Sequence, residues 1–353
     1  MKKYAFFLPQ YHEIPENNEW WGEGFTEWVS VKKAKPLFHN HIQPKHPLND
    51  NYYNLLEKKT MIEQTNLLDK YNIDGLIYYH YYFKGDKLLE KPAENLLKWK
   101  DIRQNFFFCW ANHSWIRSWN GSKEILKKQE YGSIKDWEEH FQYLLPFFKD
   151  DRYEKRNNKP LFMIFIADFS EKVEMFEYFN KRCIENGFDG IFLIESTNVM
   201  IDNPSNLNNT NYEYKIFYRE PSVCFNLYNK KIKYSPSRIV HKIKKMVALK
   251  FDRVNYVRRY KGDKILREGI KRYDKNNNVI HGLFFEWDNT PRHGKRGYVI
   301  SSISRKKFNE YMNIIKDEEY LFINAWNEWA EGMILEGYKE SGYKYLEWLN
   351  EWR

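Results

Sequence analysis

Cysteine is scarce in this sequence, with three residues (Cys109, Cys183 and Cys224) among 353. The count is odd and the spacings are unrelated, so neither a disulfide framework nor a structural zinc site is expected. Cys109 lies in the apolar run "NFFFCWA" and is predicted to belong to the core. No two histidines stand at ligand spacing beside a carboxylate in one element, so we predict no metal site.

Long hydrophobic runs are absent as well. No stretch approaches the roughly 20 apolar residues that a membrane-spanning helix needs. The opening residues "MKKYAFFLPQYH" contain too short an apolar segment for a signal peptide, and no small-residue cleavage site follows. We therefore expect a cytoplasmic protein.

The sequence also lacks the usual nucleotide-binding motifs. It has no Walker loop and no Gly-x-Ser-x-Gly elbow, and the first strand candidate leads into "FLPQYHEIPENN", which contains no glycine. No Asp-x-Asp triplet, the metal-holding pair of common nucleotide-sugar transferases, occurs anywhere. We expect no cofactor and no nucleic-acid partner.

Aromatic residues, in contrast, are abundant. They make up 18% of the chain, with 13 Trp, 27 Tyr and 25 Phe, while hydrophobic residues make up 42% and charged residues 30%. Rings fill protein cores, and they also stack on the apolar faces of sugars. Most of these rings are expected in a core, and the tryptophans beside polar clusters are the candidates for ligand contact.

Short apolar segments alternate with amphipathic helical patterns along the chain. The predicted strands are 4–10, 74–81, 105–111, 160–167, 189–196, 212–218, 279–287 and 319–326, and the predicted helices are 55–71, 135–149, 171–186, 236–250, 304–316 and 340–351. Continuous apolar character indicates strands covered on both faces, as in a parallel sheet. Eight strands with intervening helices predict an α/β protein with a single (β/α)8 barrel over residues 1–353, and a doubly wound open sheet is the alternative.

Polar and aromatic residues follow strand after strand. Catalytic groups of such barrels lie at the carboxyl ends of the strands, so these positions are site candidates. For substrate contact we predict Tyr11, His80, Trp110, Asn112, Trp287, Asn289, Arg292 and Trp326. Core packing is the alternative for each of them, the tryptophans above all. Gln43 and the "QPKHP" loop are expected to shape the mouth.

The segment "FINAWNEWAEGMILE" (322–336) carries the strongest chemical signal. It places Glu328, Glu331 and Glu336 among indoles where an apolar strand ends. Cleavage of a glycosidic bond needs a proton donor and a second carboxylate, and Glu328 and Glu331 can share one cavity if a helical turn separates them. Repulsion and burial would raise one pKa of the pair. Alternatively, one glutamate only caps a helix or pairs with arginine, and a different strand-end carboxylate takes its place: Asp168, Glu195, Glu286 or Asp288.

Positive charge is concentrated in one block. The net charge is +9, but residues 230–264 hold 13 Lys or Arg against two Asp, a local +11, which leaves −2 for the rest. The block follows the sixth predicted strand, so we expect an elaborated βα excursion there. Within it, Ile239, Ile243, Met246, Val247 and Phe251 form an apolar stripe, with Lys242, Lys244, Lys245 and Lys250 elsewhere around the helix. The stripe either packs on the barrel or holds the protein against an anionic membrane surface.

Several long motifs resemble those of a known family. The stretch from "LPQYHEIPENNEWWGEGFTEW" to "QPKHP", and then "YYHYYF", "CWAN", "HFQYLLPFFKDDRY", "KPLFMIF", "EWDNTPRHG" and "INAWNEWAEG", resemble in order the WbsX-type proteins of bacterial O-antigen and capsular polysaccharide gene clusters. That family is similar to glycoside hydrolase family 99, the endo-α-mannosidases, which are (β/α)8 barrels. The resemblance covers the chain from residue 4 to about residue 345.

The resemblance implies a retaining mechanism. Glu328 would assist the sugar's own 2-hydroxyl and Glu331 would be the acid and base, on an oligosaccharide or lipid-linked glycan. WbsX-type proteins are described as glycosyltransferases, so hydrolysis, transfer and glycan binding without catalysis stay open. Related sequences read Asn-Glu-Asn where this chain has Asn112, His113 and Ser114, so a carboxylate near the sugar is replaced.

Overall fold

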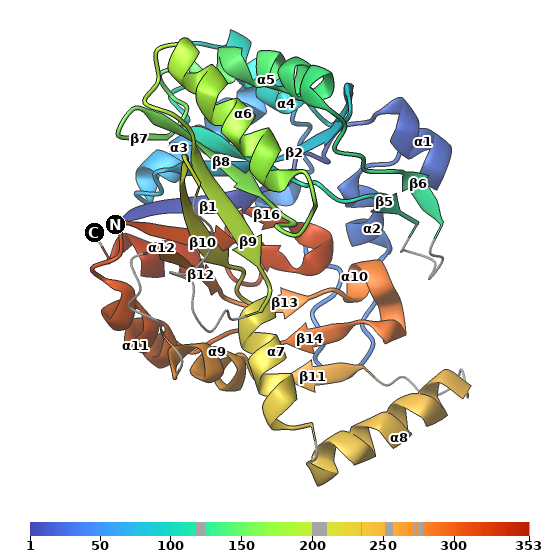
Figure 1. Cartoon of the computed structure of the whole chain (residues 1–353). Helices are drawn as coiled ribbons and strands as arrows, with labels where there is room; N and C mark the ends of the chain where they lie inside the picture. The colour runs from blue at the N-terminus through green and yellow to red at the C-terminus, as the bar shows by residue number, and fades with distance from the viewer. Residues whose placement is uncertain are drawn as a thin grey trace.

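The computed structural model describes residues 1–117, 124–199, 210–233, 235–250, 257–271, 273 and 278–352. Its centre is a closed barrel of eight parallel strands, in which each strand pairs with the next along the chain and β1 pairs with both β2 and the last strand (Figure 1). The strands are β1 (Lys2–Phe7), β2 (Gly75–Phe83), β4 (Phe106–Trp110), β8 (Lys159–Ile164), β9 (Phe192–Thr197), β10 (Glu213–Tyr218), β12 (Val279–Phe284) and β15 (Tyr320–Asn324). The predicted (β/α)8 barrel is confirmed, and each predicted strand overlaps one of these.

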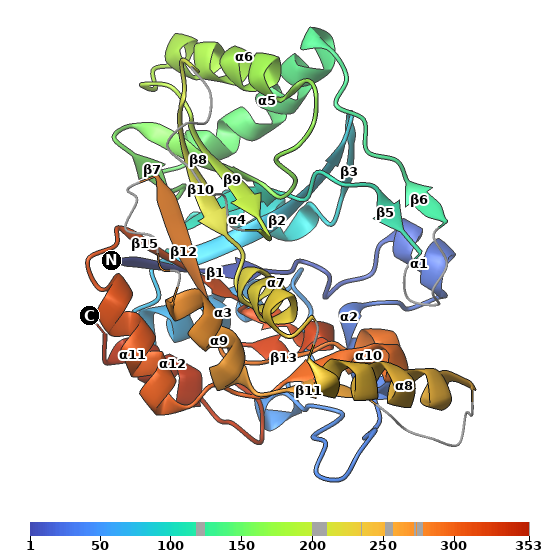
Figure 2. The same ribbon diagram turned by 60° about the horizontal axis from the view of Figure 1, so that its bottom comes forward.

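Helices surround the barrel, as Figures 1 and 2 show. The six predicted helical segments are present as α3 (Lys58–Lys70), α5 (Ile134–Phe148), α6 (Lys172–Glu185), α8 (Pro236–Lys250), α11 (Arg305–Ile315) and α12 (Lys344–Asn350). Sequence patterns did not predict the shorter helices α1 (Pro15–Trp21), α2 (Glu27–Lys33), α4 (Lys91–Lys98), α7 (Ser222–Lys231), α9 (Gly262–Ile270) and α10 (Thr290–His293). No helix of the described ranges is long and apolar enough to cross a bilayer.

Aromatic rings fill the inside of the barrel. Phe322 of β15 lies with its ring centre 5.5 Å from that of Phe107 on β4 and 5.2 Å from that of Phe217 on β10. Above them, Tyr79 of β2 stacks on Phe6 of β1, with the two ring centres 5.5 Å apart. Alternate residues of each strand point inward, so rings from different strands meet in layers. Much of the aromatic content is therefore core, and Tyr79 forms the top of that core.

The long segment after the sixth barrel strand forms the predicted excursion. It contains α7, α8, β11 (Arg258–Tyr260) and α9, and β11 joins β14 (Tyr298–Ile300) and β13 (Trp287–Asp288) in a three-stranded sheet beside the barrel.

Helix α8 extends away from the barrel beyond β11 (Figure 1). Of the two alternatives for its apolar stripe, packing on the barrel is wrong for Ile239, Ile243, Met246 and Val247, which are all exposed. Phe251, the fifth residue of that stripe, lies outside the described residues. Because α8 extends away from the barrel (Figure 1), these four side chains do not reach its core.

Candidate active site

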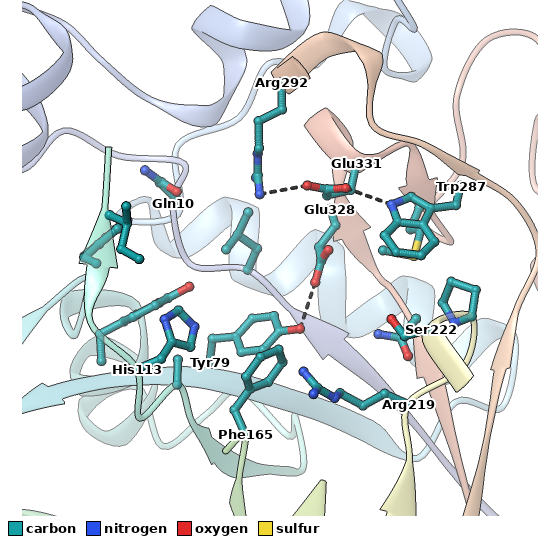
Figure 3. A pocket seen from close by; sticks show the side chains of 18 of the residues that line it. Gln10, Tyr79, His113, Phe165, Arg219, Ser222, Trp287, Arg292, Glu328 and Glu331 are labelled. Carbon is teal, nitrogen blue, oxygen red and sulfur yellow. Dashed lines mark hydrogen bonds and ion pairs between the residues drawn. The ribbon is translucent and has the colours of Figure 1, made fainter. Parts of the chain in front are cut away.

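The loop after β15 holds both predicted catalytic glutamates. Asn327 and Glu328 form the short strand β16, which pairs with β17 (Met333–Ile334). A single 3₁₀ turn, Trp329–Glu331, lies between these two strands and ends with Glu331. Gly332 ends the turn with φ 64°, and a Cβ there would lie 2.9 Å from the backbone oxygen of Asp288. Only glycine fits both constraints. The turn places Glu328 and Glu331 in one cavity, where Figure 3 shows them beside each other.

Buried side chains hold this loop in place. Asn327 Oδ1 accepts from the backbone N–H of Leu8 at 2.7 Å and its Nδ2 donates to the Leu8 carbonyl at 3.1 Å, which ties the loop to the end of β1. Glu336 accepts from the Trp329 indole at 2.6 Å and from the Tyr53 hydroxyl at 2.7 Å. Burial raises the pKa of Glu336 to about 7. Because of its hydrogen bonds to Trp329 and Tyr53, Glu336, the third carboxyl of the segment, helps to hold the loop in place.

A cavity of about 830 Å³ opens at the carboxyl ends of the barrel strands. Its walls come from widely separated parts of the chain and include Tyr79, Tyr81, Phe165, Arg219, Trp287, Arg292, Glu328 and Glu331. Rings that surround a few convergent charged groups are typical of a ligand site. The size suits one or more sugar rings.

Glu328 lines this cavity beside Tyr79. Its Oε1 accepts a hydrogen bond of 2.9 Å from the hydroxyl of Tyr79, at the top of the barrel core. Burial, and then the charge of Glu331, raise the pKa of Glu328 to about 7, against the lowering effect of Tyr79 and Arg292. Near neutral pH, Glu328 therefore populates both its protonated and its ionised forms, as a general acid or base does.

Glu331 is in a different environment from that of its partner. Arg292 Nη1 lies 2.9 Å from its Oε1, and the Trp287 indole donates to its Oε2 at 2.8 Å (Figure 3). Arg292 also reaches the fully buried Glu27 at 3.1 Å, and Glu27 Oε1 accepts from the backbone N–H of Ala330 at 3.2 Å. Two carboxyls three residues apart thus have unlike surroundings, the condition that separates acid and base roles.

Of the eight residues predicted to contact substrate, Trp287 and Arg292 line the cavity. The other six lie behind its wall with their polar groups bonded within the protein: Tyr11 to the Asn327 carbonyl, His80 to His140, Trp110 to the Tyr82 carbonyl, Asn112 to Ile166, Asn289 to Tyr298, and Trp326 to Gln64. These six are buried and have no surface on the cavity. Ligand contact in this cavity is thus available to two of the eight.

The alternative strand-end carboxylates are absent from the lining of this cavity, as far as the described residues show. Glu195 pairs with Lys172 at 3.0 Å and Glu286 with Lys45 at 2.7 Å. Asp288 accepts from Gln43 at 2.7 Å, and Gln43, which was expected to shape the mouth, is buried and does not line this cavity. Within the described parts of the chain, no three His, Cys, Asp or Glu side chains are grouped to hold a metal ion.

Sequence reasoning missed Tyr79, Tyr81, Phe165 and Arg219 as cavity residues. His80 was predicted to contact substrate, but the opposite face of β2, with Tyr79 and Tyr81, lines the cavity. The alternation of side chains along a strand was the available signal, and only the barrel's closure says which face is inside. His113, at the departure from the family motif, also lines the cavity.

A (β/α)8 barrel with two adjacent glutamates and aromatic walls at its carboxyl end has the architecture of a carbohydrate-active enzyme. A family model described as "Glycosyltransferase WbsX" matches residues 3–349, and the chain belongs to this family.

Two curated relatives, both named uncharacterized protein WxcX, come from Xanthomonas campestris pv. campestris strains B100 and ATCC 33913. Each is 27% identical to this chain over 97% of its length. The chain spans about half of those relatives, 48% of each.

Similar solved structures share the fold. A glycoside hydrolase family 99 endo-α-mannosidase from Bacteroides thetaiotaomicron, in complex with bis-tris propane, is 13% identical with a TM-score of 0.57, over 99% of this chain and 95% of that one. A glycoside hydrolase-like protein is 12% identical with a TM-score of 0.57, over 99% and 94%. The relation to family 99 is therefore one of fold.

Proposed function

We propose that the chain is a retaining glycan-active enzyme that uses Glu328 and Glu331 as its catalytic pair. The observation that carries the proposal is their unlike environment in one cavity: Glu328 has a pKa raised to about 7, while Glu331 is held by Arg292 and Trp287. The substrate we propose is a bacterial surface polysaccharide or its lipid-linked precursor, in line with the resemblance to WbsX-type proteins.

In the proposed reaction, Glu328 takes the proton of the sugar's 2-hydroxyl, whose oxygen attacks the anomeric carbon. Glu331 gives a proton to the departing glycosidic oxygen, and a 1,2-anhydro sugar results. Glu331 then takes a proton from the acceptor, whose oxygen opens the anhydro ring as Glu328 returns its proton to the 2-hydroxyl. Two inversions give net retention. The first step therefore needs Glu328 in its ionised form.

Substitution of each glutamate tests the assignment. Glu331→Gln should lose at least about a hundredfold in kcat/KM on an unactivated glycan and retain most activity on a glycosyl fluoride, whose leaving group needs no proton. Glu328→Gln should lose both activities, because no base then assists the 2-hydroxyl. Glu195→Gln, a carboxylate away from the cavity, is the control. Wild-type rates in both cavity variants would refute the catalytic pair, and the reverse pattern would exchange the two roles.

Transfer to a sugar hydroxyl is the second candidate, favoured by the family description "Glycosyltransferase WbsX". The same pair performs hydrolysis or transfer, since only the second-step acceptor differs. Product analysis with and without an added acceptor glycan separates the two. A thermal-shift screen extends the test: stabilisation by a nucleoside diphosphate would indicate a nucleotide-sugar donor, and glycan binding without any cleavage would indicate a binding protein.

A further inference from the structure

Arg219 follows β10 directly and points its side chain into the cavity, below Glu328 (Figure 3). Its backbone N–H donates to the Thr197 carbonyl at 2.9 Å, which fixes the start of the side chain. The guanidinium carbon lies 3.9 Å from the ring centre of Phe165, a close cation–π contact. The guanidinium is thus held against Phe165 on one wall of the cavity.

The guanidinium has no acidic partner. Across the described ranges, no carboxylate forms an ion pair with Arg219 and no side-chain hydrogen bond of it is present, and its buried Nε has no hydrogen-bond partner. Burial lowers its pKa, and only the weak effects of Tyr79 and Cys109 oppose this. Arg292, the other cation of the cavity, pairs with both Glu27 and Glu331. A largely desolvated cation is costly unless an anion reaches it.

We propose that Arg219 binds an anionic group of the glycan, a carboxylate or a phosphate, beside the bond that the glutamate pair acts on. The planar guanidinium matches the two oxygens of either group. The neighbouring His113 cannot supply the charge, because burial, and also the charge of Arg219, lower the pKa of His113. This inference deepens the proposed function, from a glycan in general to an acidic glycan, and rests on that function for the role of the site.

Ligand-observed NMR titrations can measure this preference without turnover. The probes are methyl α-D-glucuronide, α-D-glucose 1-phosphate and the neutral methyl α-D-glucoside. At least one anionic probe should bind roughly tenfold tighter than the glucoside, and the better one identifies carboxylate or phosphate. Arg219→Gln should remove this preference, and Arg219→Lys should keep part of it. Equal binding of all three probes, no binding of either anionic probe, or an unchanged preference in Arg219→Gln would overturn the proposal.

Two further variants make the result specific. His113→Glu would place a carboxylate beside the guanidinium, since His113 and Arg219 both contact Phe165. This variant should weaken the binding of the anionic probe to the level seen in Arg219→Gln. Glu331→Gln should keep the preference, so acid selectivity and catalysis can fail separately. An anion preference without any cleavage would reject the enzyme function and retain the anionic subsite.

A second surface carries an independent inference. The exposed face of α8 consists of Ile239 (57% exposed), Val240 (49%), Ile243 (52%), Met246 (67%) and Val247 (43%). These positions repeat with the helical period, so they form one continuous apolar stripe. None of these five side chains belongs to a hydrophobic cluster of the protein. An apolar stripe on an isolated helix indicates an external surface to which it binds.

The charge around the stripe indicates which surface it is. Lys242 and Lys244 are exposed and lie on opposite flanks of the stripe by the helical period. The surrounding segment, residues 230–264, holds 13 basic residues against two acidic ones. An apolar stripe flanked by lysines is typical of a helix that lies in the interface of an anionic bilayer. The chain reaches α8 from α7, whose Ser222 lines the cavity.

We infer that α8 docks the protein on an anionic membrane surface, next to the cavity that receives the glycan. Co-sedimentation with vesicles of phosphatidylcholine, alone or mixed with phosphatidylglycerol, tests this. Binding should be roughly tenfold stronger to the anionic vesicles and should weaken at high salt. The double variant Ile243→Glu/Met246→Glu should abolish it, and Lys242→Glu/Lys244→Glu should remove the salt-sensitive part.

Ile184→Glu, at a 56% exposed apolar residue of α6, is the matched control and should bind like the wild type. Equal recovery on neutral and anionic vesicles would overturn the membrane inference. So would unchanged binding in the α8 variants. If the α8 variants alter only the oligomeric state in size-exclusion chromatography, a second copy of the chain covers the stripe and the inference also fails.

Discussion

At the residue scale, the ionised form of Glu328 controls the chemistry. Burial and the charge of Glu331 raise the pKa of Glu328 to about 7, and the reaction we propose begins with Glu328 as the base that takes the proton of the 2-hydroxyl. Below this pH the carboxyl of Glu328 is protonated and cannot act as that base. Activity is therefore lost as pH falls through 7, whereas a solvent-exposed glutamate would stay ionised down to its ordinary pKa.

The first prediction concerns this pH dependence. The kcat/KM should fall about tenfold per pH unit below pH 7, since the ionised form of Glu328 becomes the minor species. The hydroxyl of Tyr79 lowers the pKa of Glu328, so Tyr79→Phe should move the fall to higher pH. Initial rates of both proteins across pH 5 to 9 measure it. A flat profile, or a fall that does not move in Tyr79→Phe, would contradict the assignment to Glu328.

At the element scale, two asparagines fasten the ends of neighbouring barrel strands. Asn327, after β15, bonds to both backbone groups of Leu8, and Asn112, after β4, bonds to both backbone groups of Ile166 at 2.8 and 2.7 Å. Both side chains are fully buried. The two asparagines make the same pair of hydrogen bonds, but only Asn327 is adjacent to a catalytic candidate.

The second prediction uses Asn327 and Asn112 to separate effects on stability from effects on catalysis. Asn327→Ala and Asn112→Ala should each lower the free energy of unfolding by about 2–4 kcal/mol, because two buried backbone groups lose their partners. Only Asn327→Ala should also lower kcat in the fraction that remains folded, since Glu328 follows it directly. Denaturant unfolding and rates at matched folded concentration measure both. Equal kcat losses in the two variants would show that Asn327 has no special role in positioning Glu328.

At the scale of the whole molecule, the structure carries several buried carboxyls whose pKa is raised. Burial raises the pKa of Glu328 and Glu336 to about 7 and that of Glu220 to about 8. Between the ordinary glutamate pKa and these values, the folded state holds protons that the unfolded chain has released. The stability that these groups contribute is therefore complete at low pH and is lost as pH rises toward 8.

The third prediction tests one of these groups. Glu336→Gln removes its titration while an amide oxygen can still accept from the Trp329 indole. The free energy of unfolding of the wild type should fall by about 2–3 kcal/mol more than that of the variant between pH 5 and pH 8. Urea unfolding at both pH values measures the difference. Parallel losses in the two proteins would show that Glu336 is not the group that titrates.

Much of the architecture follows from the sequence, for a local reason. Several barrel strands, such as β4 (Phe106–Trp110), are buried on both faces and therefore appear as uninterrupted apolar segments. Long helices such as 135–149 show their period over several turns, while the seven residues of α2 are too few to show one. The pair Glu328 and Glu331 was also predictable, because one turn of chain fixes their separation.

Other features depended on contacts that no local pattern contains. Tyr79 and His80 are adjacent in the chain, and the closure of the barrel alone sends Tyr79 to the cavity and His80 behind it. The stripe of α8 has the period of a packed helix, yet the path of the excursion leaves it exposed. Arg219 lacks a partner only because no distant carboxylate reaches it among the described residues. The sequence by itself determined the barrel strands, the longer helices and the closeness of Glu328 to Glu331, since each arises within one turn, strand or helix; the tertiary structure alone decided which side chains meet in the cavity, because burial and charge pairing there join residues hundreds of positions apart.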